Sequence, residues 1–427
     1  MLIEFSVTNF RSIQARQTLT MVASSDKAHI QHNVAPTKEK GLLLLRSAVI
    51  YGPNAAGKSN ILRALHTLQQ MVLKSATAYQ VGQLIPVTPF LLTKASTEQP
   101  TTFDIIFTGD DGVRYHYVCE AGPKRIFKEW LVAYPNGRPQ RWFERSYDPK
   151  TDKENWWFGP KFVSNQAERK IWQEFTGANV LFLSNAIKLN NEQLRPAYSW
   201  LAHKLVFFMP DDKINLVLGL ELLREDSGNE QIMRFMRAAD IGIDRLEVRE
   251  EDLAPIPPHG NIGVHFGFGL PVVGLAGPLK RVRVLAWHKR TDDEVDVPLD
   301  LNEESDGTHK LFAFIGPLLS VLELGATLIV DELDSSLHPH ITRLLVGLFH
   351  SRSNEKNAQL VFTTHNTTFM DTELLRRDQI WFVEKDAKRS TQLYSLLEYS
   401  PRKDEALGRG YLKGRYGAIP FVGRFEV

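Results

Sequence analysis

The chain has 427 residues, which is enough for two or three domains, and its apolar fraction of 43% and charged fraction of 24% are ordinary for a folded protein. This composition excludes a disordered chain, and the formal charge of +1 excludes a global attraction to nucleic acid or anionic lipid. Cys119 is the only cysteine, so the chain can form neither an internal disulfide nor a cysteine-based zinc site of its own.

The N-terminal residues MLIEFSVTNFRSIQ alternate between apolar and polar types, as in a half-buried strand over residues 2–10. They lack the basic and then apolar run of a signal peptide, and no stretch of the chain reaches eighteen apolar residues. We therefore expect a cytoplasmic protein that does not span a membrane.

A strand, a loop and a helix follow one another over residues 46–74. LLLLRSAVIYG at 42–52 predicts a fully buried strand, which runs directly into a glycine-rich loop. From Ser59 onward, apolar residues recur at helical spacing. This order is the one that a phosphate-binding P-loop requires.

The middle of the chain changes character twice. Segments that alternate like strands, separated by the turn signals GDDG and YPNGRP, predict an antiparallel β-layer over 85–160. Residues 161–240 are mostly helical in pattern, although Pro196 interrupts one segment, and they indicate a helical insertion or arm.

The stretch from 254 to 278 contains too many proline and glycine residues for a helix, and predicts a long, mobile loop or an irregular hairpin. Beyond it the alternation of strand and helix resumes and closes the α/β sheet. The predicted elements are a strand at 282–289, a helix at 307–324, a buried strand at 326–333, a helix at 339–350 and a buried strand at 358–365.

The motif GPNAAGKS at 52–59 matches the P-loop pattern in full. Its backbone N–H groups would hold the phosphates of ATP, Lys58 would reach the β and γ phosphates, and Ser59 would ligate Mg²⁺. A chance glycine-rich turn is the alternative, which the flanking strand and helix disfavour. The predicted nucleotide-binding residues here are Gly52, Asn54, Gly57, Lys58, Ser59 and Asn60.

Two carboxylates follow the apolar strand ATLIV at 326–330 directly. Asp331 would hold Mg²⁺, and Glu332 would orient and deprotonate the attacking water. The alternative, that both acids cap a strand, is disfavoured because such a pair is costly unless a positive charge lies nearby. His365, at the end of the strand LVFTT, is placed to sense the γ-phosphate rather than to serve only in the core.

GPNAAGKS, NEESDGTHKL, ATLIVDELDSSLHP and VFTTHN, in this order, resemble the ABC-type heads of the SMC, RecF and OLD ATPases. The resemblance implies that Ser305 and Gly307 bind the γ-phosphate of an opposite protomer, and that Asp334 begins the D-loop. It also implies that Arg11, in NFRS, reaches the nucleotide phosphates; a surface arginine is the alternative.

The resemblance predicts a fold class: an α/β ABC-type P-loop ATPase head, with a mixed sheet, an antiparallel β-layer and a mostly helical insertion.

The signature segment, Glu304-Ser305-Asp306-Gly307, departs from the pattern LSGGQ, which implies slow or partner-dependent hydrolysis. No Q-loop glutamine can be assigned. The predicted segments are 1–84 with the P-loop, the β-layer 85–160, the helical insertion 161–250, the C-terminal lobe 251–400 and a basic tail 401–427.

More narrowly, the N-terminal MLIEFSVTNFRSI and the C-terminal GYLKGRYGAIP resemble stand-alone ATPases of bacterial anti-phage systems, of the RloA, AbiL and PARIS AriA type. That resemblance implies a homodimer or higher homo-oligomer that controls a separately encoded effector, such as a TOPRIM or other nuclease-like protein. The residues after His365 are too few to hold a TOPRIM domain in the chain itself.

Two further segments leave nucleic acid open as a partner. Residues 123–161 interleave Lys and Arg with aromatic residues, which suits base stacking but suits an ordinary packed β-layer better. The basic tail at 402–424 could dock on a partner or pack on its own head.

The leading hypothesis is therefore a defence ATPase that switches an effector. The alternatives are a RecF-like DNA-binding repair ATPase and an ATP-bound scaffold with little turnover, while an ABC transporter subunit fits the two ends of the chain less well.

Overall fold

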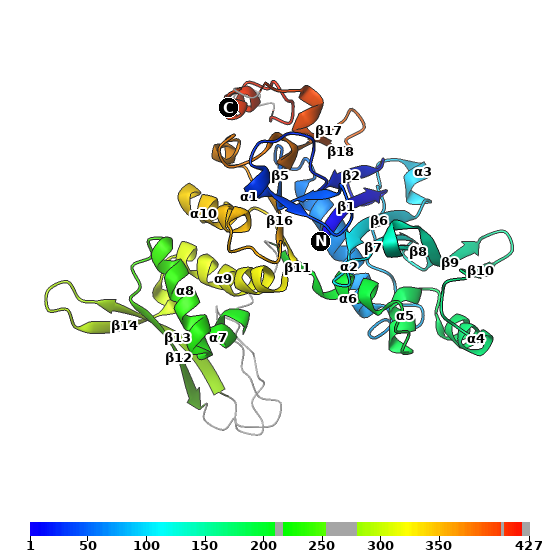
Figure 1. Cartoon of the computed structure of the whole chain (residues 1–427), viewed down its shortest axis with the longest axis horizontal. Coiled ribbons are helices and arrows are strands. Elements are labelled where there is room, and N and C mark those ends of the chain that lie inside the picture. Colours follow the sequence, from blue (N-terminus) through cyan, green and yellow to red (C-terminus); the bar gives the residue numbers. More distant parts are fainter. Residues whose placement is uncertain (210–216, 253–279, 403–404, 421–427) are drawn as a thin grey trace, which may run out of the picture. The chain divides into compact units, whose positions relative to one another are not determined.

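The computed structural model describes residues 1–209, 217–252, 280–402 and 405–420. The chain divides into two compact units, each of which is discontinuous in sequence (Figure 1). The first unit comprises Met1–Met209, Val321–Leu333 and Leu345–Val427, and the second comprises Pro210–Ser320 and Asp334–Leu344. These units do not follow the five segments expected from the sequence, whose status as domains stays a prediction.

A six-stranded, mostly parallel sheet forms one layer of the first unit. Its strand order is β11-β15-β16-β5-β17-β18, and only β18 runs antiparallel to its neighbour. β5, β15 and β16 are buried along their whole length, as expected of parallel strands covered on both faces. The strands are β5 (Ser47–Tyr51), β11 (Leu205–Phe208), β15 (Thr327–Val330), β16 (Gln359–Thr363), β17 (Ile380–Lys385) and β18 (Thr391–Ser395).

The strand predicted at 42–52 is two strands in two different sheets. β4 (Leu43–Leu45) pairs with β3 (Val34–Pro36), which follows the short helix α1 (Ile30–Asn33), whereas β5 joins the parallel sheet. Arg46 separates them, and its guanidinium NH2 donates to Asn357 Oδ1 at 2.8 Å. A cation in the middle of the apolar run must reach such a partner, and this breaks the strand.

A seven-stranded antiparallel sheet forms the other layer, in the order β10-β9-β8-β7-β6-β1-β2. The predicted β-layer is thus present, but it also includes the N-terminal strand, because β1 pairs with β6. The strands are β1 (Leu2–Thr8), β2 (Gln17–Thr20), β6 (Thr101–Thr108), β7 (Arg114–Ala121), β8 (Ile126–Tyr134), β9 (Gln140–Asp148) and β10 (Lys153–Phe158).

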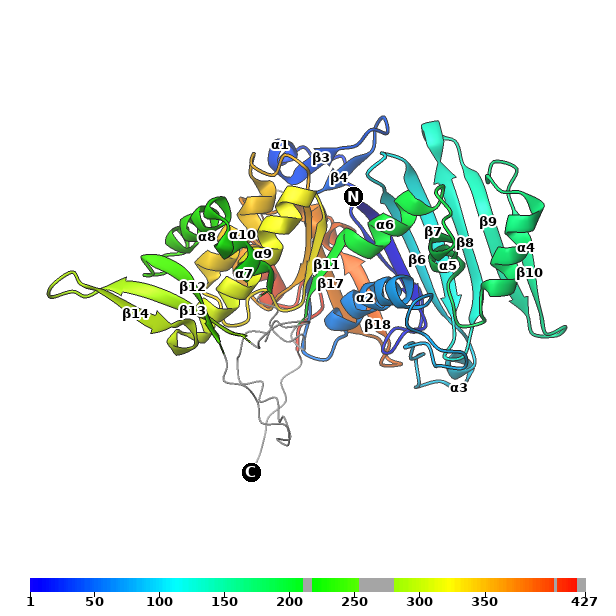
Figure 2. The ribbon, with the colours of Figure 1, turned by 90° about the horizontal axis from the view of Figure 1, so that it is seen from below.

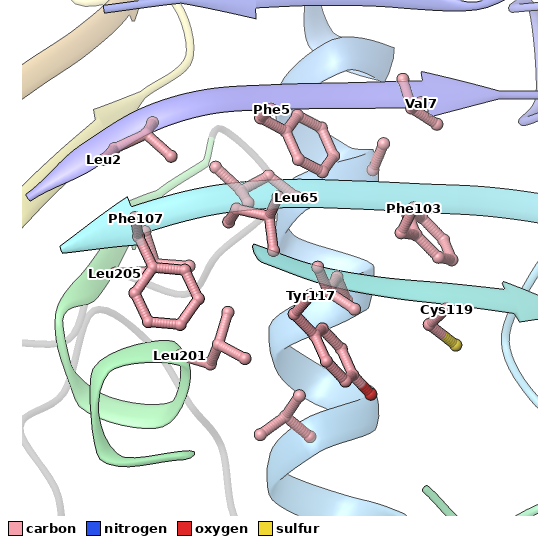
Figure 3. Close-up of a cluster of buried hydrophobic side chains, with 14 of the residues drawn as sticks. Leu2, Phe5, Val7, Leu65, Phe103, Phe107, Tyr117, Cys119, Leu201 and Leu205 are labelled. Atoms are coloured by element: carbon pink, nitrogen blue, oxygen red, sulfur yellow. The ribbon is translucent and has the colours of Figure 1, made fainter. Parts of the chain in front are cut away.

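Helix α2 (Lys58–Lys74) links the P-loop to the core of the first unit. Its buried residues recur every three or four positions and pack against β1 and β6. In Figure 3, Leu65 of α2 lies among Phe5 of β1 and Phe107 of β6. Burial of this stripe fixes the start of α2, and therefore the phosphate loop, against the antiparallel sheet.

Three shorter helices follow the antiparallel sheet: α4 (Gln166–Phe175), α5 (Phe182–Lys188) and α6 (Arg195–His203). Figure 2 shows α5 and α6 along this sheet, where Phe182 packs on Phe143 and Trp200 stacks on Phe107. Pro196 lies in the first turn of α6, so it begins this helix rather than interrupting one. Among the described residues, no helix is both long enough and apolar enough to cross a membrane.

The second unit combines helices with a three-stranded antiparallel sheet in the order β12-β13-β14. The predicted strand at 282–289 is confirmed within β13, and the helix predicted at 307–324 is α9. The loop or hairpin predicted between 254 and 278 lies outside the described residues. The elements are α7 (Val217–Arg224), α8 (Asp226–Ala238), β12 (Arg245–Asp252), β13 (Lys280–Lys289) and β14 (Asp296–Asp300), with α9 (Asp306–Leu324) and α10 (Pro339–His350) continuing into the first unit.

The described part of the C-terminal tail, 405–420, packs on its own head. Tyr411, in helix α11 (Leu407–Leu412), packs on Tyr51 and stacks on Phe382, and Tyr416 stacks on Phe382 as well. The Ala418 N–H donates to Glu384 Oε2 at 2.9 Å. Of the two alternatives for the tail, the structure therefore favours the packed one.

Cations of the basic, aromatic stretch at 123–161 are paired with acids of the same sheet. Arg145 is 2% exposed, and its Nε lies 3.1 Å from Oε2 of the fully buried Glu129. Glu129 also accepts from the backbone N–H groups of Phe182 and Leu183, which begin α5. The cations Arg125, Lys128 and Arg141 contact Glu154 and Glu144. The packed β-layer is therefore the better interpretation of this stretch.

We predict that Glu129→Ala lowers the free energy of unfolding by about 3–5 kcal/mol, because it removes the fully buried partner of the Arg145 guanidinium and leaves only the partly exposed Glu154, 3.8 Å away, as a counter-charge. The measurement is urea unfolding of the purified protein. Glu144→Ala is the matched control, since its partners Arg141 and Lys128 are partly exposed and such pairs contribute about 0–1 kcal/mol. Equal losses in the two variants would contradict the buried-pair interpretation.

Candidate nucleotide site

The glycine-rich loop lies between the end of β5 and the start of α2, as the sequence predicts. Gly52 and Gly57 have positive φ values of 154° and 111°. A Cβ on Gly52 would lie 2.2 Å from the carbonyl oxygen of Val383, and one on Gly57 would lie 2.2 Å from Oγ1 of Thr391. Both motif glycines are thus required by close packing against β17 and β18. Asn54 is exposed at the tip of the loop.

Lys58 and His365 are brought together at the start of α2. The Lys58 side chain is buried, and its Nζ donates to the carbonyl oxygens of Gly52 at 2.9 Å and Pro53 at 3.2 Å. The same Nζ lies 3.1 Å from Nε2 of His365. An ammonium can only donate, so Nε2 accepts in this contact, and the N-terminus of α2 adds a partial positive charge.

Asp331 and Glu332 follow β15, and one hydroxyl group positions both of them. Oγ1 of Thr363 donates to Oδ1 of Asp331 at 2.7 Å and accepts from the backbone N–H of Glu332 at 2.8 Å. Asp331 is buried, whereas Glu332 is partly exposed and has a positive φ of 55°. A left-handed conformation costs a residue with a side chain about 1–3 kcal/mol, and it clusters at functional sites.

Three parallel strands place these groups at one edge of the sheet. β16 pairs with β15 on one side and with β5 on the other. The carboxyl ends of parallel strands meet at the same edge, which is where ligands bind in such sheets. The P-loop after β5, the two acids after β15 and His365 after β16 are therefore neighbours, although they are far apart in sequence.

Asn60, in the first turn of α2, is held by a cluster of hydroxyl groups. Its Nδ2 donates to Oγ of Ser12 at 2.7 Å, and Ser12 Oγ lies 2.8 Å from Thr391 Oγ1. The Thr391 hydroxyl donates to the carbonyl of Ala56 at 2.8 Å. A hydroxyl has one proton, so Ser12 must donate to Thr391. The cluster ties the N-terminal turn and the β17–β18 hairpin to the phosphate loop.

Arg11 lies in the turn that precedes Ser12. Its φ of 49° is left-handed, and its backbone N–H donates to the carbonyl of Thr88 at 2.7 Å. The structure brings it beside Lys385, whose Nζ donates to Thr391 Oγ1 at 3.0 Å. Burial lowers the pKa of Lys385, and the neighbouring Asp386 opposes this effect. A contact of Arg11 with phosphate stays a prediction.

Ser305, Gly307 and Asp334 belong to the second unit. The Ser305 hydroxyl accepts from the backbone N–H of Thr308 at 3.2 Å, in the first turn of α9. A Cβ on Gly307 would lie 3.0 Å from the carbonyl oxygen of Ser336. The carbonyl of Asp334 accepts from the N–H of Leu337 at 3.3 Å. Their assignment to the nucleotide of a second protomer stays a prediction.

Three positioning residues were missed by the sequence reasoning. Thr363 stands two residues before His365 at the end of a buried strand, and Ser12 directly follows Arg11. Their closeness in sequence to predicted site residues could have identified both. Thr391 lies in a hairpin that carries no motif, and only the tertiary contact with Ala56 reveals it.

The donor atoms at this edge suit Mg²⁺ and a triphosphate. Mg²⁺ prefers oxygen ligands, takes one or two from the protein and shares the substrate phosphates. The Asp331 carboxylate supplies such an oxygen, and so does the hydroxyl of Ser59, which follows Lys58 in the first turn of α2. The helix N-terminus and Lys58 supply positive charge for the phosphates.

A protein-family model matches residues 47–371, which is most of the chain and contains the P-loop, both acids and His365. Its description is "AAA domain, putative AbiEii toxin, Type IV TA system". The chain therefore belongs to this family of AAA-domain P-loop ATPases. A search of curated proteins found no match to the chain.

Solved structures similar to the chain include two SMC heads. The SMC head domain from Thermotoga maritima is 13% identical, with a TM-score of 0.38 over 92% of this chain and 98% of that one. The Smc head domain from Pyrococcus furiosus, with an extended coiled coil and bound to the C-terminal domain of ScpA, is also 13% identical, with a TM-score of 0.36 over 93% and 97%. The predicted fold class, an α/β P-loop ATPase head with mixed sheets, is confirmed. The evidence for it is the strand order and the P-loop of this chain itself.

Proposed function

We propose that the chain binds ATP with Mg²⁺ at the start of α2 and hydrolyses it to ADP and phosphate. The observation that carries this proposal is the contact between Lys58 Nζ and His365 Nε2, at the sheet edge where Asp331 and Glu332 also lie. Membership in the AAA-domain family supports it.

In the proposed reaction, Lys58 exchanges its carbonyl acceptors for oxygens of the β and γ phosphates. Asp331 and Ser59 would hold Mg²⁺, which when bound would supply positive charge to the phosphates. Glu332 accepts a proton from the attacking water, and His365 contacts the γ-phosphate. Thr363 keeps the two carboxylates in separate roles, because it donates to Asp331 while accepting from the backbone, not the side chain, of Glu332.

We predict that Glu332→Gln lowers ATP turnover at least about 100-fold while ATP binding is retained, because the amide cannot take the proton. Phosphate release and equilibrium binding of ATP to the purified protein measure the two effects. Glu323→Gln, an exposed glutamate of α9, is the matched control. Turnover at the wild-type rate in Glu332→Gln would show that another residue is the general base.

We also propose that two heads associate around the nucleotide, in a homodimer or a larger homo-oligomer. Ser305 and Gly307 would face the γ-phosphate of the opposite protomer, and Asp334 would lie in the same interface. The support is the resemblance of the segment NEESDGTHKL to an ABC signature and its position at the start of α9. Helix N-termini are suited to bind phosphate.

The dimer proposal predicts that Glu332→Gln gains mass with ATP, relative to ADP, because the unhydrolysed nucleotide holds two heads together. Adding Ser305→Arg should abolish the gain, because the long side chain would fill the space that the γ-phosphate of the opposite protomer requires, with ATP binding to each head unchanged within about threefold. Light scattering after gel filtration measures the mass. A gain that persists in the double variant would contradict the assigned interface.

We further propose a role in bacterial anti-phage defence, in which the nucleotide state controls a separately encoded effector. The family description names a toxin and a toxin–antitoxin system, which supports a partner gene product. We predict that Lys58→Ala abolishes protection of cells that carry the chain with its neighbouring gene, measured as phage plaque counts. Protection that is independent of Lys58 would contradict nucleotide control.

Of the two alternatives, the RecF-like DNA-binding ATPase has lost its main support, because cations of the stretch at 123–161 are paired with Glu129, Glu144 and Glu154. The scaffold alternative predicts ATP-dependent mass changes without turnover. Release of many phosphates per protomer by the wild-type protein would exclude it.

A further inference from the structure

A cavity of about 550 Å³ lies in the first unit, beside the hydroxyl cluster of the phosphate loop. Its walls come from the N-terminal turn, the segment Thr88–Leu92 and the β17–β18 hairpin. Three cations line it, Arg11, Lys385 and Arg389, and none of the described lining residues is an acid. Phe90, Leu91 and Leu92 form an apolar side, on which both leucines are about three-fifths exposed. The volume is within the range of small-molecule sites.

Hydrogen bonds connect this cavity to the end of the P-loop that holds the α-phosphate. Ser12 lines the cavity and accepts from Asn60, which follows the two residues that end the P-loop motif. Lys385 also lines it and donates to Thr391, which donates in turn to Ala56 of the loop. P-loop N–H groups hold the α and β phosphates. A nucleotide seated there, with its γ-phosphate at Lys58 Nζ, would therefore direct its ribose and base toward Asn60 and Ser12, where the cavity lies.

We propose that this cavity holds the ribose and base of the nucleotide, and that Lys385 and Arg389 of the β17–β18 hairpin are specificity-determining residues for it. The proposal rests on the ATP site proposed above. It adds that the β17–β18 hairpin, in the C-terminal part of the chain, forms one wall of the nucleotide site. In this proposal, Leu91 and Leu92 would cover one face of the base and the Arg389 guanidinium would contact the other, since all three residues line the cavity.

The residues that line the cavity suit a purine base better than a separately bound inorganic anion. A flat aromatic base gains from apolar contact with the leucines and from a guanidinium over its ring. Phosphate alone would use the cations but would leave the apolar side unused. Since Arg389 is exposed at a left-handed turn and Leu92 is exposed, substitution of either side chain spares the core.

The test compares two ligands of the full chain by titration calorimetry in the presence of Mg²⁺: a non-hydrolysable ATP analogue, and tripolyphosphate, which lacks ribose and base. We expect Arg389→Ala and Leu92→Ala each to weaken the ATP analogue about tenfold, the size of a cation–π or apolar contact, and to leave tripolyphosphate unchanged within about twofold. Lys388→Ala, on the same hairpin turn but outside the cavity lining, is the matched control and should change neither affinity.

Different failures are distinguishable in this experiment. If Arg389→Ala and Leu92→Ala leave the ATP analogue at wild-type affinity, or weaken both ligands equally, the base lies elsewhere and the proposal is overturned while the ATP site stands. If the wild-type chain binds neither ligand, or if Lys58→Ala binds both as tightly as the wild type, the ATP site itself is wrong and the present proposal falls with it.

Discussion

Strand β16 pairs in parallel with β5 on one side and with β15 on the other, and the chemistry assigned to this protein depends on that pairing. The register places Val361 opposite both Ala48 and Ile329, so the carboxyl ends of the three strands lie within two residues of one another along the sheet. One edge of the sheet therefore receives the phosphate loop, two carboxylates and a histidine. Without this register, the three motifs would be separate features of the sequence and could not share one nucleotide.

Short polar side chains then determine how the edge is arranged in detail. Thr363 links Asp331 and Glu332 to β16, and Thr391 with Ser12 links the phosphate loop to the β17–β18 hairpin and the N-terminal turn. These hydroxyl groups are largely buried, and a buried hydroxyl is stable only when its hydrogen bonds are made. The packing that satisfies them also fixes the loop. The same contacts make Gly52 and Gly57 necessary, because backbone and side-chain oxygens approach both glycines too closely for a Cβ.

The sequence predicted those parts of the fold whose signals are local. The helix after the P-loop, the strands β13, β15 and β16 and the helix at 339–350 have strong periodicity or continuous apolar runs, and they are confirmed. The order of these elements indicated an α/β sheet, and the resemblance to ABC-type ATPase heads supplied the fold class. The break of the strand at Arg46 and the pairing of β1 with β6 depend on contacts with Asn357 and Ile106, which are remote in sequence.

The candidate site shows the same limit. Lys58 and His365, each found from its own motif, lie 3.1 Å apart, and Asp331 and Glu332 directly follow β15. Their joint action on one nucleotide stays a prediction. The stretch 123–161 was predicted to be a packed β-layer more readily than a nucleic-acid surface, but a single sequence does not show which face of a strand each cation occupies. The burial of Arg145 against Glu129 is therefore visible only in the fold. Thr391 belongs to no motif and could be found only from the fold.

The central claim is that Lys58, Asp331, Glu332 and His365 act on one triphosphate. The most direct test is a structure of the protein with Mg²⁺ and a non-hydrolysable ATP analogue. We expect Lys58 Nζ and His365 to contact the γ-phosphate, Asp331 to face the metal ion, and the Glu332 carboxylate to lie across from the γ-phosphorus with room for one water. A triphosphate bound without contact to Lys58, or with Glu332 turned away from the γ-phosphate, would contradict it.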